Sequence, residues 1–158
     1  MPDYSLSLLL KSPDETTALA KKFATVLGAG DVLLLEGGIG AGKTHFARSL
    51  IQSLLDAPED VPSPTFTLVQ TYETKSFEIW HADLYRLSSP DEVIELGLVD
   101  AFEDSVCLVE WPDRLAELAP QNALSLRFAL NETEGHRLLV IEGAYLRWKR
   151  LIEMISDD

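Results

Sequence analysis

The hydrophobic residues of this chain recur with two periods, one typical of strands and one typical of helices. Alternating or continuous apolar runs predict strands at residues 4–10, 32–36, 66–72, 77–82, 105–109, 124–130 and 137–141. Apolar residues at helical spacing predict helices at residues 13–27, from about residue 43 to 55, and at 89–98, 115–118 and 144–155. Strands and helices mixed in this way indicate a layered α/β domain. We therefore expect one α/β domain over residues 1–158, with a mixed central sheet flanked by helices.

The first predicted helix carries its own start signal. Ser12 is a candidate N-cap, Pro13 suits the first helical position, and Glu15 completes a capping box. The glycines at residues 28–30 are expected to end this helix near Leu27.

The run GGIGAGKT, residues 37–44, stands between a predicted strand and a predicted helix. Gly37, four residues, Gly42, Lys43 and Thr44 form a complete phosphate-loop pattern. Backbone N–H groups at a helix N-terminus lack intrahelical partners and attract anions. Lys43 would add a full charge for the outer phosphates, and Thr44 a hydroxyl for Mg²⁺. A glycine-rich turn with a chance lysine is the alternative, and the strand–loop–helix setting disfavours it. The sequence therefore predicts a P-loop NTPase domain that binds ATP or ADP with Mg²⁺.

Other polar residues are placed to complete such a site. Asp83 and Glu110 each end an apolar predicted strand, where the strands of an open α/β sheet converge on the ligand crevice. Both are candidate magnesium ligands and catalytic residues, or else strand caps in solvent. Thr65, in the proline-stiffened stretch 63–68, is a candidate switch threonine. His81 shares a strand face with Asp83 and either lines the site or makes a structural hydrogen bond.

The charge balance bears on partners. The chain has 13 Lys and Arg against 26 Asp and Glu, a net charge of −13. A protein that grips nucleic acid alone presents a basic face, so we expect no autonomous nucleic-acid binding. No apolar run approaches the roughly 20 residues of a membrane span. The N-terminus lacks the features of a signal peptide, and one cysteine excludes an internal disulfide. We expect a cytoplasmic protein that does not bind membranes and is monomeric when alone.

Four motifs, GAGKTHFAR, SPTF, HADLYRL and VEWPDR, occur in this order within about residues 30–115. In these motifs the chain resembles the TsaE family, formerly called YjeE. The resemblance implies a small bacterial P-loop ATPase that is needed to make threonylcarbamoyladenosine at position 37 of tRNAs reading codons that begin with A. It also implies that the ATPase joins the TsaB–TsaD pair and drives its turnover, without performing the carbamoyl transfer.

The resemblance also suggests roles by position. Thr65 looks like the switch I threonine, Asp83 like the Walker B or switch II aspartate, and Glu110 like an acid near magnesium with Trp111 beside it. The base would be held by the start of the first helix and by the polar loop 131–136. The residues expected to bind nucleotide or metal, or to take part in catalysis, are Lys11, Ser12, Gly37, Gly40, Ala41, Gly42, Lys43, Thr44, His45, Thr65, Asp83, Glu110, Trp111 and Thr133.

The chain departs from the family pattern at two positions. Gly38 stands where an acidic residue is usual, and His45 where a small hydroxyl residue is common. Two other functions stay open. A small-molecule kinase would need an acceptor pocket and an arginine-bearing lid, and no lid-like insertion with paired arginines is found. A non-hydrolysing, nucleotide-gated adaptor would have Glu110 pointing away from the site. Arg86 and Arg114 either neutralise γ-phosphate charge or pair with neighbouring acids.

Overall fold

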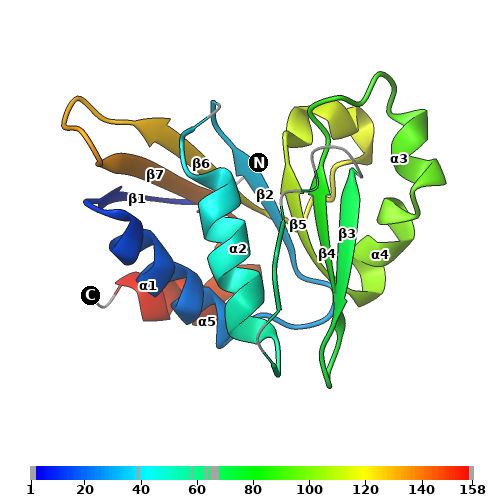
Figure 1. Cartoon of the computed structure of the whole chain (residues 1–158), viewed down its shortest axis with the longest axis horizontal. Helices are drawn as coiled ribbons and strands as arrows, with labels where there is room; N and C mark the ends of the chain where they lie inside the picture. Colours follow the sequence, from blue (N-terminus) through cyan, green and yellow to red (C-terminus); the bar gives the residue numbers. More distant parts are fainter. Residues whose placement is uncertain (1–2, 39, 58, 63, 65–67, 157–158) are drawn as a thin grey trace.

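A computed structural model of the chain describes residues 3–38, 40–57, 59–62, 64 and 68–156. Its strands form one seven-stranded sheet in the order β1-β7-β6-β2-β5-β4-β3 (Figure 1). The strands are β1 (Tyr4–Leu10), β2 (Val32–Glu36), β3 (Val69–Glu73), β4 (Glu78–Asp83), β5 (Val106–Glu110), β6 (Leu124–Leu130) and β7 (Arg137–Gly143). Strand β2 pairs in parallel with β5 and β6, and β4 with β5, whereas β1, β3 and β7 pair antiparallel with their neighbours. The predicted mixed central sheet is confirmed.

Helices cover both faces of the central strands. They are α1 (Pro13–Ala24), α2 (Lys43–Leu54), α3 (Asp91–Glu95), α4 (Leu98–Asp104), the 3₁₀ helix η1 (Pro112–Leu118) and α5 (Tyr145–Ser156). Leu33 and Leu35 of β2 pack in the core shared with α1, α2 and α5. Val32 and Leu34 pack in a second core with α4 and η1. Because β2 is buried on both faces, its sequence is continuously apolar rather than alternating.

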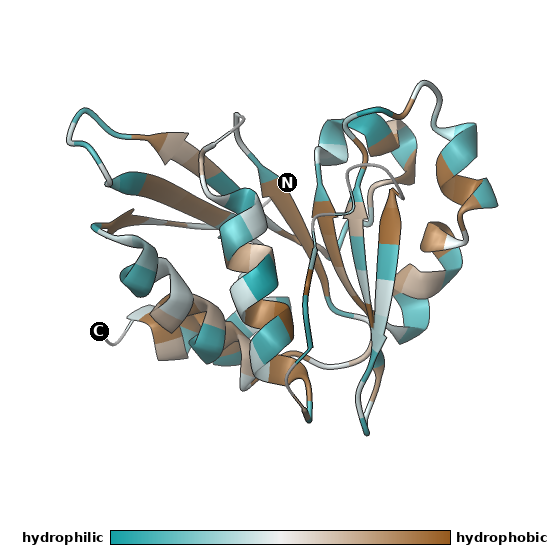
Figure 2. Ribbon diagram, in the orientation of Figure 1, coloured by the Kyte–Doolittle hydropathy of each residue, from teal (hydrophilic) through white to brown (hydrophobic). Residues whose placement is uncertain are grey.

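The distribution of hydropathy follows these two cores. Hydrophobic residues concentrate along the strands, whereas the loop between β6 and β7 is hydrophilic (Figure 2). None of the described helices has both the length and the apolar character needed to cross a membrane.

The start of α1 is as predicted, but its end is not. The Ser12 hydroxyl accepts from the Glu15 N–H at 3.2 Å, and Glu15 Oε1 accepts from the N–H of Lys11, the residue before the N-cap, at 2.8 Å. This reciprocal pair is a variant of the capping box. The helix was expected to reach Leu27 and instead ends at Ala24. Thr25 closes it, because its hydroxyl and its N–H both bond to the Lys22 carbonyl.

Two further boundaries differ from the predictions. The helix expected at 89–98 is the shorter α3, and the helix that follows it, α4, was not predicted. Gly97 has φ of 83°, a left-handed conformation that ends α3 before α4 begins. The strand expected to begin at residue 66 begins at Val69, because Leu68 has φ of 67°. Residues 65–67 lie outside the described part of the chain.

The register of the parallel strands positions the site. Asp83 at the end of β4 lies beside Glu110 at the end of β5, and Glu110 lies beside Leu35 of β2. Residues in register project from the same face of a sheet, so both carboxylates project toward the face that α2 covers. The loop from β2 to α2 starts at this same edge.

Candidate functional site

The loop between β2 and α2 has a backbone shape that requires glycine. Gly37 has φ of 142°, and a Cβ there would lie 2.4 Å from the Phe128 carbonyl oxygen of β6. Gly40 and Gly42 also have positive φ. Gly42 is the N-cap of α2, and no side chain makes a capping bond there. The first N–H groups of α2 are thus left for an anion, as a phosphate loop requires.

Lys43 is buried at the mouth of this loop, with a relative exposure of 5%. Its Nζ donates to the Gly37 carbonyl at 2.5 Å and lies 3.7 Å from the centroid of the Trp111 ring. Trp111 is itself in the left-handed region, with φ of 58°, and its ring lies 4.8 Å from that of Tyr85. The lysine is therefore held between the loop and an aromatic pair.

Burial shifts the charged groups of the site. It lowers the pKa of Lys43, while the nearby carboxylates of Glu110, Asp83 and Asp113 oppose that shift. Burial raises the pKa of Asp83, and the N–H of Tyr85, which donates to Oδ1 at 3.1 Å, opposes that rise. The cavity thus holds a cation and a carboxylate that are both costly to keep charged without a ligand.

Glu110 links the phosphate loop to the sheet. Its Oε1 accepts from the Thr44 hydroxyl at 2.8 Å, and its Oε2 lies 2.7 Å from His81 Nε2. Glu110 is 2% exposed and His81 is fully buried. The alternative of Glu110 as a strand cap in solvent is excluded by this burial.

His81 has one bonded and one unbonded ring nitrogen. The sequence left open whether His81 lines the site or makes a structural hydrogen bond, and in the structure it makes a hydrogen bond, to Glu110. Its Nδ1 is buried and has no hydrogen-bond partner among the described residues. A buried polar group left unpaired costs roughly 1–3 kcal/mol.

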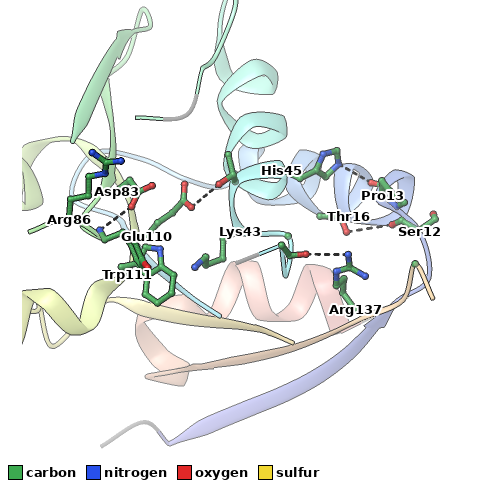
Figure 3. Close-up of a pocket in the computed structure, with 15 residues that line it drawn as sticks. Ser12, Pro13, Thr16, Lys43, His45, Asp83, Arg86, Glu110, Trp111 and Arg137 are labelled. Atoms are coloured by element: carbon green, nitrogen blue, oxygen red, sulfur yellow. Dashed lines mark hydrogen bonds between the residues drawn. The ribbon is translucent and has the colours of Figure 1, made fainter. Parts of the chain in front are cut away.

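One cavity of about 630 Å³ is lined by Lys43, Thr44, Asp83, Glu110 and Trp111. Figure 3 shows Asp83, Glu110, Trp111 and Arg86 at one end, Lys43 near the middle, and the start of α1 with Arg137 at the other end. The cavity is lined by Ser12, Pro13, Thr16, Gly40, Gly42, Lys43, Thr44, His45, Asp83, Tyr85, Arg86, Glu110, Trp111, Gly135 and Arg137.

The far end of the cavity is built from two elements that reach across to α2 and its loop. His45 Nε2 contacts the Thr17 hydroxyl at 3.0 Å and the Pro13 carbonyl at 3.2 Å, which ties α1 to α2. From the start of β7, Arg137 donates to the Gly40 carbonyl at 3.2 Å. The first turn of α1 and the β6–β7 hairpin therefore both contribute to this end of the cavity.

Most of the predicted site residues line the cavity, and some do not. Those that line it are Ser12, Gly40, Gly42, Lys43, Thr44, His45, Asp83, Glu110 and Trp111. Lys11, Gly37, Ala41 and Thr133 do not contribute to the lining. Gly37 shapes the loop and Lys11 donates to the capping box. Thr65 lies outside the described residues.

Several lining residues were missed from the sequence. They are Pro13, Thr16, Tyr85, Gly135 and Arg137. Gly135 and Arg137 are close in sequence to Thr133, so the segment around the predicted polar loop does contribute to the lining, through these two residues. Tyr85 and Arg86 follow Asp83 within three residues. The sequence offered Arg86 either as a group that neutralises γ-phosphate charge or as a partner of neighbouring acids, and the structure places it on the cavity lining.

The oxygen ligands in the cavity suit a hard cation. Within the described ranges, no group of three or more His, Cys, Asp or Glu side chains could hold a metal by itself. The Thr44 hydroxyl and the Asp83 and Glu110 carboxylates are, however, ligands that Mg²⁺ accepts when phosphate oxygens and water complete its shell. The residues therefore fit a metal that enters with a nucleotide.

Comparisons with known proteins agree on one family. The family model described as "Threonylcarbamoyl adenosine biosynthesis protein TsaE" matches residues 10–139. The chain is 39% identical to the Rickettsia bellii tRNA threonylcarbamoyladenosine biosynthesis protein TsaE over 137 residues, which are 87% of this chain and 94% of the relative. It is 41% identical to the Bacillus subtilis protein of the same name over 146 residues, 92% and 90% of the two chains.

A solved structure extends this likeness to three dimensions. The crystal structure of Bacillus subtilis YdiB superposes with a TM-score of 0.78 at 30% identity, and covers 98% of this chain and 95% of that one. The family model spans most of the chain, and the two TsaE relatives are covered almost end to end. This chain belongs to the TsaE family.

Proposed function

We propose that this chain is a magnesium-dependent ATPase that serves the synthesis of threonylcarbamoyladenosine in tRNA as a nucleotide-dependent partner of the TsaB–TsaD pair. The observation that carries the proposal is the cavity in which a complete phosphate loop, Lys43, and the bonded pair Thr44 and Glu110 come together. Membership of the TsaE family supports the role in tRNA modification.

The cavity has the size and polarity that a nucleotide needs. Its volume of about 630 Å³ is within the range of small-molecule sites. The N–H groups at the start of α2 and the Lys43 ammonium suit the phosphates. The end formed by Ser12, Pro13 and the β6–β7 hairpin then takes the nucleoside.

Thr44 and Glu110 would hold the metal on the loop side, with Asp83 beside them. Thr44 donates its one hydroxyl proton to Glu110, so the lone pairs of its oxygen stay available to a cation. When bound, Mg²⁺ supplies positive charge that offsets the charge on the phosphate oxygens during transfer.

The residues around the phosphate end would promote hydrolysis by position and charge. Glu110 and Asp83 are buried carboxylates that can orient a water at the γ-phosphate. Lys43 and Arg86 line the same end and would neutralise charge on the outer phosphates. We expect hydrolysis to be slow for the chain alone and faster with a partner. Tyr85 and Arg86, which follow Asp83 closely in sequence, are exposed, so a partner can contact them and complete the catalytic site.

The net charge of the chain indicates that its partners, and not the chain itself, bind the tRNA. With a net charge of −13, the chain would be repelled by a polyanion rather than release counterions from it. We therefore expect the isolated chain to bind tRNA weakly at physiological salt, and the modification to need the whole complex. Tight tRNA binding by this chain alone would contradict the assignment.

ATP turnover with and without the TsaB–TsaD pair tests the proposal. Phosphate release should be slow for the chain alone and faster with the pair, and Lys43→Ala should lose both ATP binding and release. Lys149→Ala is the matched control, because Lys149 is 58% exposed and, among the described residues, forms its ion pair with Glu153 on its own helix. If the TsaB–TsaD pair does not change the rate of phosphate release, the chain is an ATPase that does not act with this pair.

Two outcomes would favour the competing functions. ADP formed only with an added acceptor, and without inorganic phosphate, would indicate a kinase. ATP binding with no turnover in any state would indicate an adaptor. The position of Glu110, inside the cavity on Thr44, argues against the adaptor.

A further inference from the structure

Resting on the proposed function, we propose that His81 is a positioning residue for Glu110, holding one carboxylate oxygen so that the other stays on Thr44. Three elements meet in this chain of contacts. His81 is on β4, Glu110 ends β5, and Thr44 is in the first turn of α2. Figure 3 shows Glu110 projecting from the sheet toward the start of α2.

The register of β4 and β5 explains why His81 can reach Glu110. His81 pairs with Leu108, two residues before Glu110, so both side chains project from the same face of the sheet. The distance from His81 Nε2 to Glu110 Oε2 is 2.7 Å, and both residues are almost wholly buried. Water therefore does not compete for this contact.

The hydrogen bonds that link His81, Glu110 and Thr44 have one consistent arrangement of protons. A carboxylate can only accept, so Nε2 of His81 donates to Oε2 while the Thr44 hydroxyl donates to Oε1. The other His81 nitrogen, Nδ1, is then buried without a partner among the described residues. An apolar side chain would fill the same space without that cost, so the contact to Glu110 is what the histidine provides.

The physical role of the contact is to stop the carboxylate from turning. The terminal torsion of a glutamate is soft, and one hydrogen bond to Thr44 leaves the second oxygen free to rotate. Donors on both oxygens of Glu110 fix the plane of the group. Residues that hydrogen-bond a metal ligand, without contacting the metal themselves, hold metal-binding carboxylates in place in this way.

Three substitutions separate this role from simple packing. His81→Gln keeps a donor at the same number of bonds from the backbone as Nε2. His81→Asn moves the donor back to the position of Nδ1, and His81→Leu fills the space without a donor. If His81 only fills the core, donor position would not matter, and Leu would be tolerated at least as well as Gln.

The experiment measures phosphate release, Mn²⁺ affinity of the ADP complex by electron paramagnetic resonance, and nucleotide affinity without metal. His81→Asn and His81→Leu should lose roughly 10- to 100-fold in release and in Mn²⁺ affinity. His81→Gln should stay within about threefold of wild type on the same measurements. Nucleotide affinity without metal should stay within about twofold in all three variants, because the phosphate loop is untouched. Lys149→Ala is again the control, since Lys149 is 58% exposed and does not line the cavity.

A double variant tests whether His81 acts through Glu110. In a Glu110→Gln background, His81→Leu should cause no further loss of Mn²⁺ affinity. A folded His81→Leu protein with wild-type release and Mn²⁺ affinity would overturn the inference. Equal losses of phosphate release and Mn²⁺ affinity in the His81→Gln and His81→Asn variants would also overturn it. This comparison holds even when His81→Leu does not fold. A wild-type chain that fails to bind ATP would instead refute the proposed function itself.

Discussion

At the scale of single residues, Glu110 connects the phosphate loop to the two neighbouring strands β4 and β5. It is almost fully buried, accepts from Thr44 and His81, and lies beside Asp83 across two parallel strands. Its position as the last residue of β5 was visible in the sequence. Its partner on β4 was not, because pairing of His81 with Glu110 depends on a register that no local pattern specifies.

Replacing Glu110 by glutamine should suppress hydrolysis and leave nucleotide binding largely intact. The side chains are nearly isosteric, but the amide has no charge for a metal and its nitrogen cannot accept from His81. We expect phosphate release to fall by about tenfold or more, and nucleotide affinity to stay within about twofold. Stopped-flow phosphate release and a fluorescent nucleotide titration measure the two. Release at the wild-type rate would leave Asp83 to act alone.

Asp83→Asn should stabilise the free protein at neutral pH. Burial raises the pKa of Asp83 above its ordinary value of 3.8, so the folded state binds the proton more tightly than the unfolded state does. The stability that this group contributes is present below pH 3.8 and is lost as the pH rises through the folded pKa. Asparagine avoids that loss and keeps the acceptor for the Tyr85 N–H.

The expected result is a higher Tm for Asp83→Asn than for wild type at pH 7. Thermal denaturation across pH 4–8, without metal or nucleotide, measures it. The gain should shrink as the pH falls toward 3.8. A gain that is equal at every pH would show that the charge of Asp83 is not its cause.

At the scale of elements, the phosphate loop depends on a strand far away in the sequence. Gly37→Ala should distort the loop, because the new Cβ would lie 2.4 Å from the Phe128 carbonyl of β6 and φ is 142°. The backbone conformation alone costs roughly 1–3 kcal/mol for a non-glycine residue. We expect a lower Tm and a loss of about tenfold or more in nucleotide affinity.

Gly28→Ala is the control for this change. Gly28 has nothing within 4 Å of an added Cβ, so its Tm and nucleotide affinity should match those of wild type. If Gly37→Ala binds nucleotide as tightly as Gly28→Ala, the close contact with β6 does not shape the loop.

The type of most elements could be predicted from the sequence, because each carries its own local signal. The capping box at Ser12 and the apolar run of β2 are such signals. Helix α4 was not predicted, and the predicted helix 89–98 ends early as α3. Gly97, which separates the two, adopts its left-handed φ beside Trp80, a contact from another element. Arg137 was missed as a cavity residue for the same reason. Its place depends on β7 lying between β1 and β6, and strand order is a property of the whole sheet.

At the scale of the whole molecule, nucleotide and partner should be coupled. The partner surface is expected near the switch-like segments 61–67 and 83–88, because segments of this kind report whether γ-phosphate is present. Residues 63 and 65–67 lie outside the described ranges. Nucleotide should change the affinity for the TsaB–TsaD pair, and the pair should change nucleotide affinity by the same factor, about 5- to 150-fold. Calorimetry with an ATP analogue, with ADP and without nucleotide measures this. Equal affinities in all three states would indicate a passive subunit.

The strand order also sets when the molecule can acquire its site during synthesis. Strand β2 leaves the ribosome early, but its neighbours β5 and β6 begin at Val106 and Leu124, and β1 pairs only with β7. Contacts between such distant segments form late and slowly. A nascent chain that has not reached β6 lacks the Phe128 carbonyl against which the loop is shaped. If the chain binds nucleotide as proposed, nucleotide should stabilise only chains that have passed this point, and shorter chains should meet chaperones and proteases without that protection.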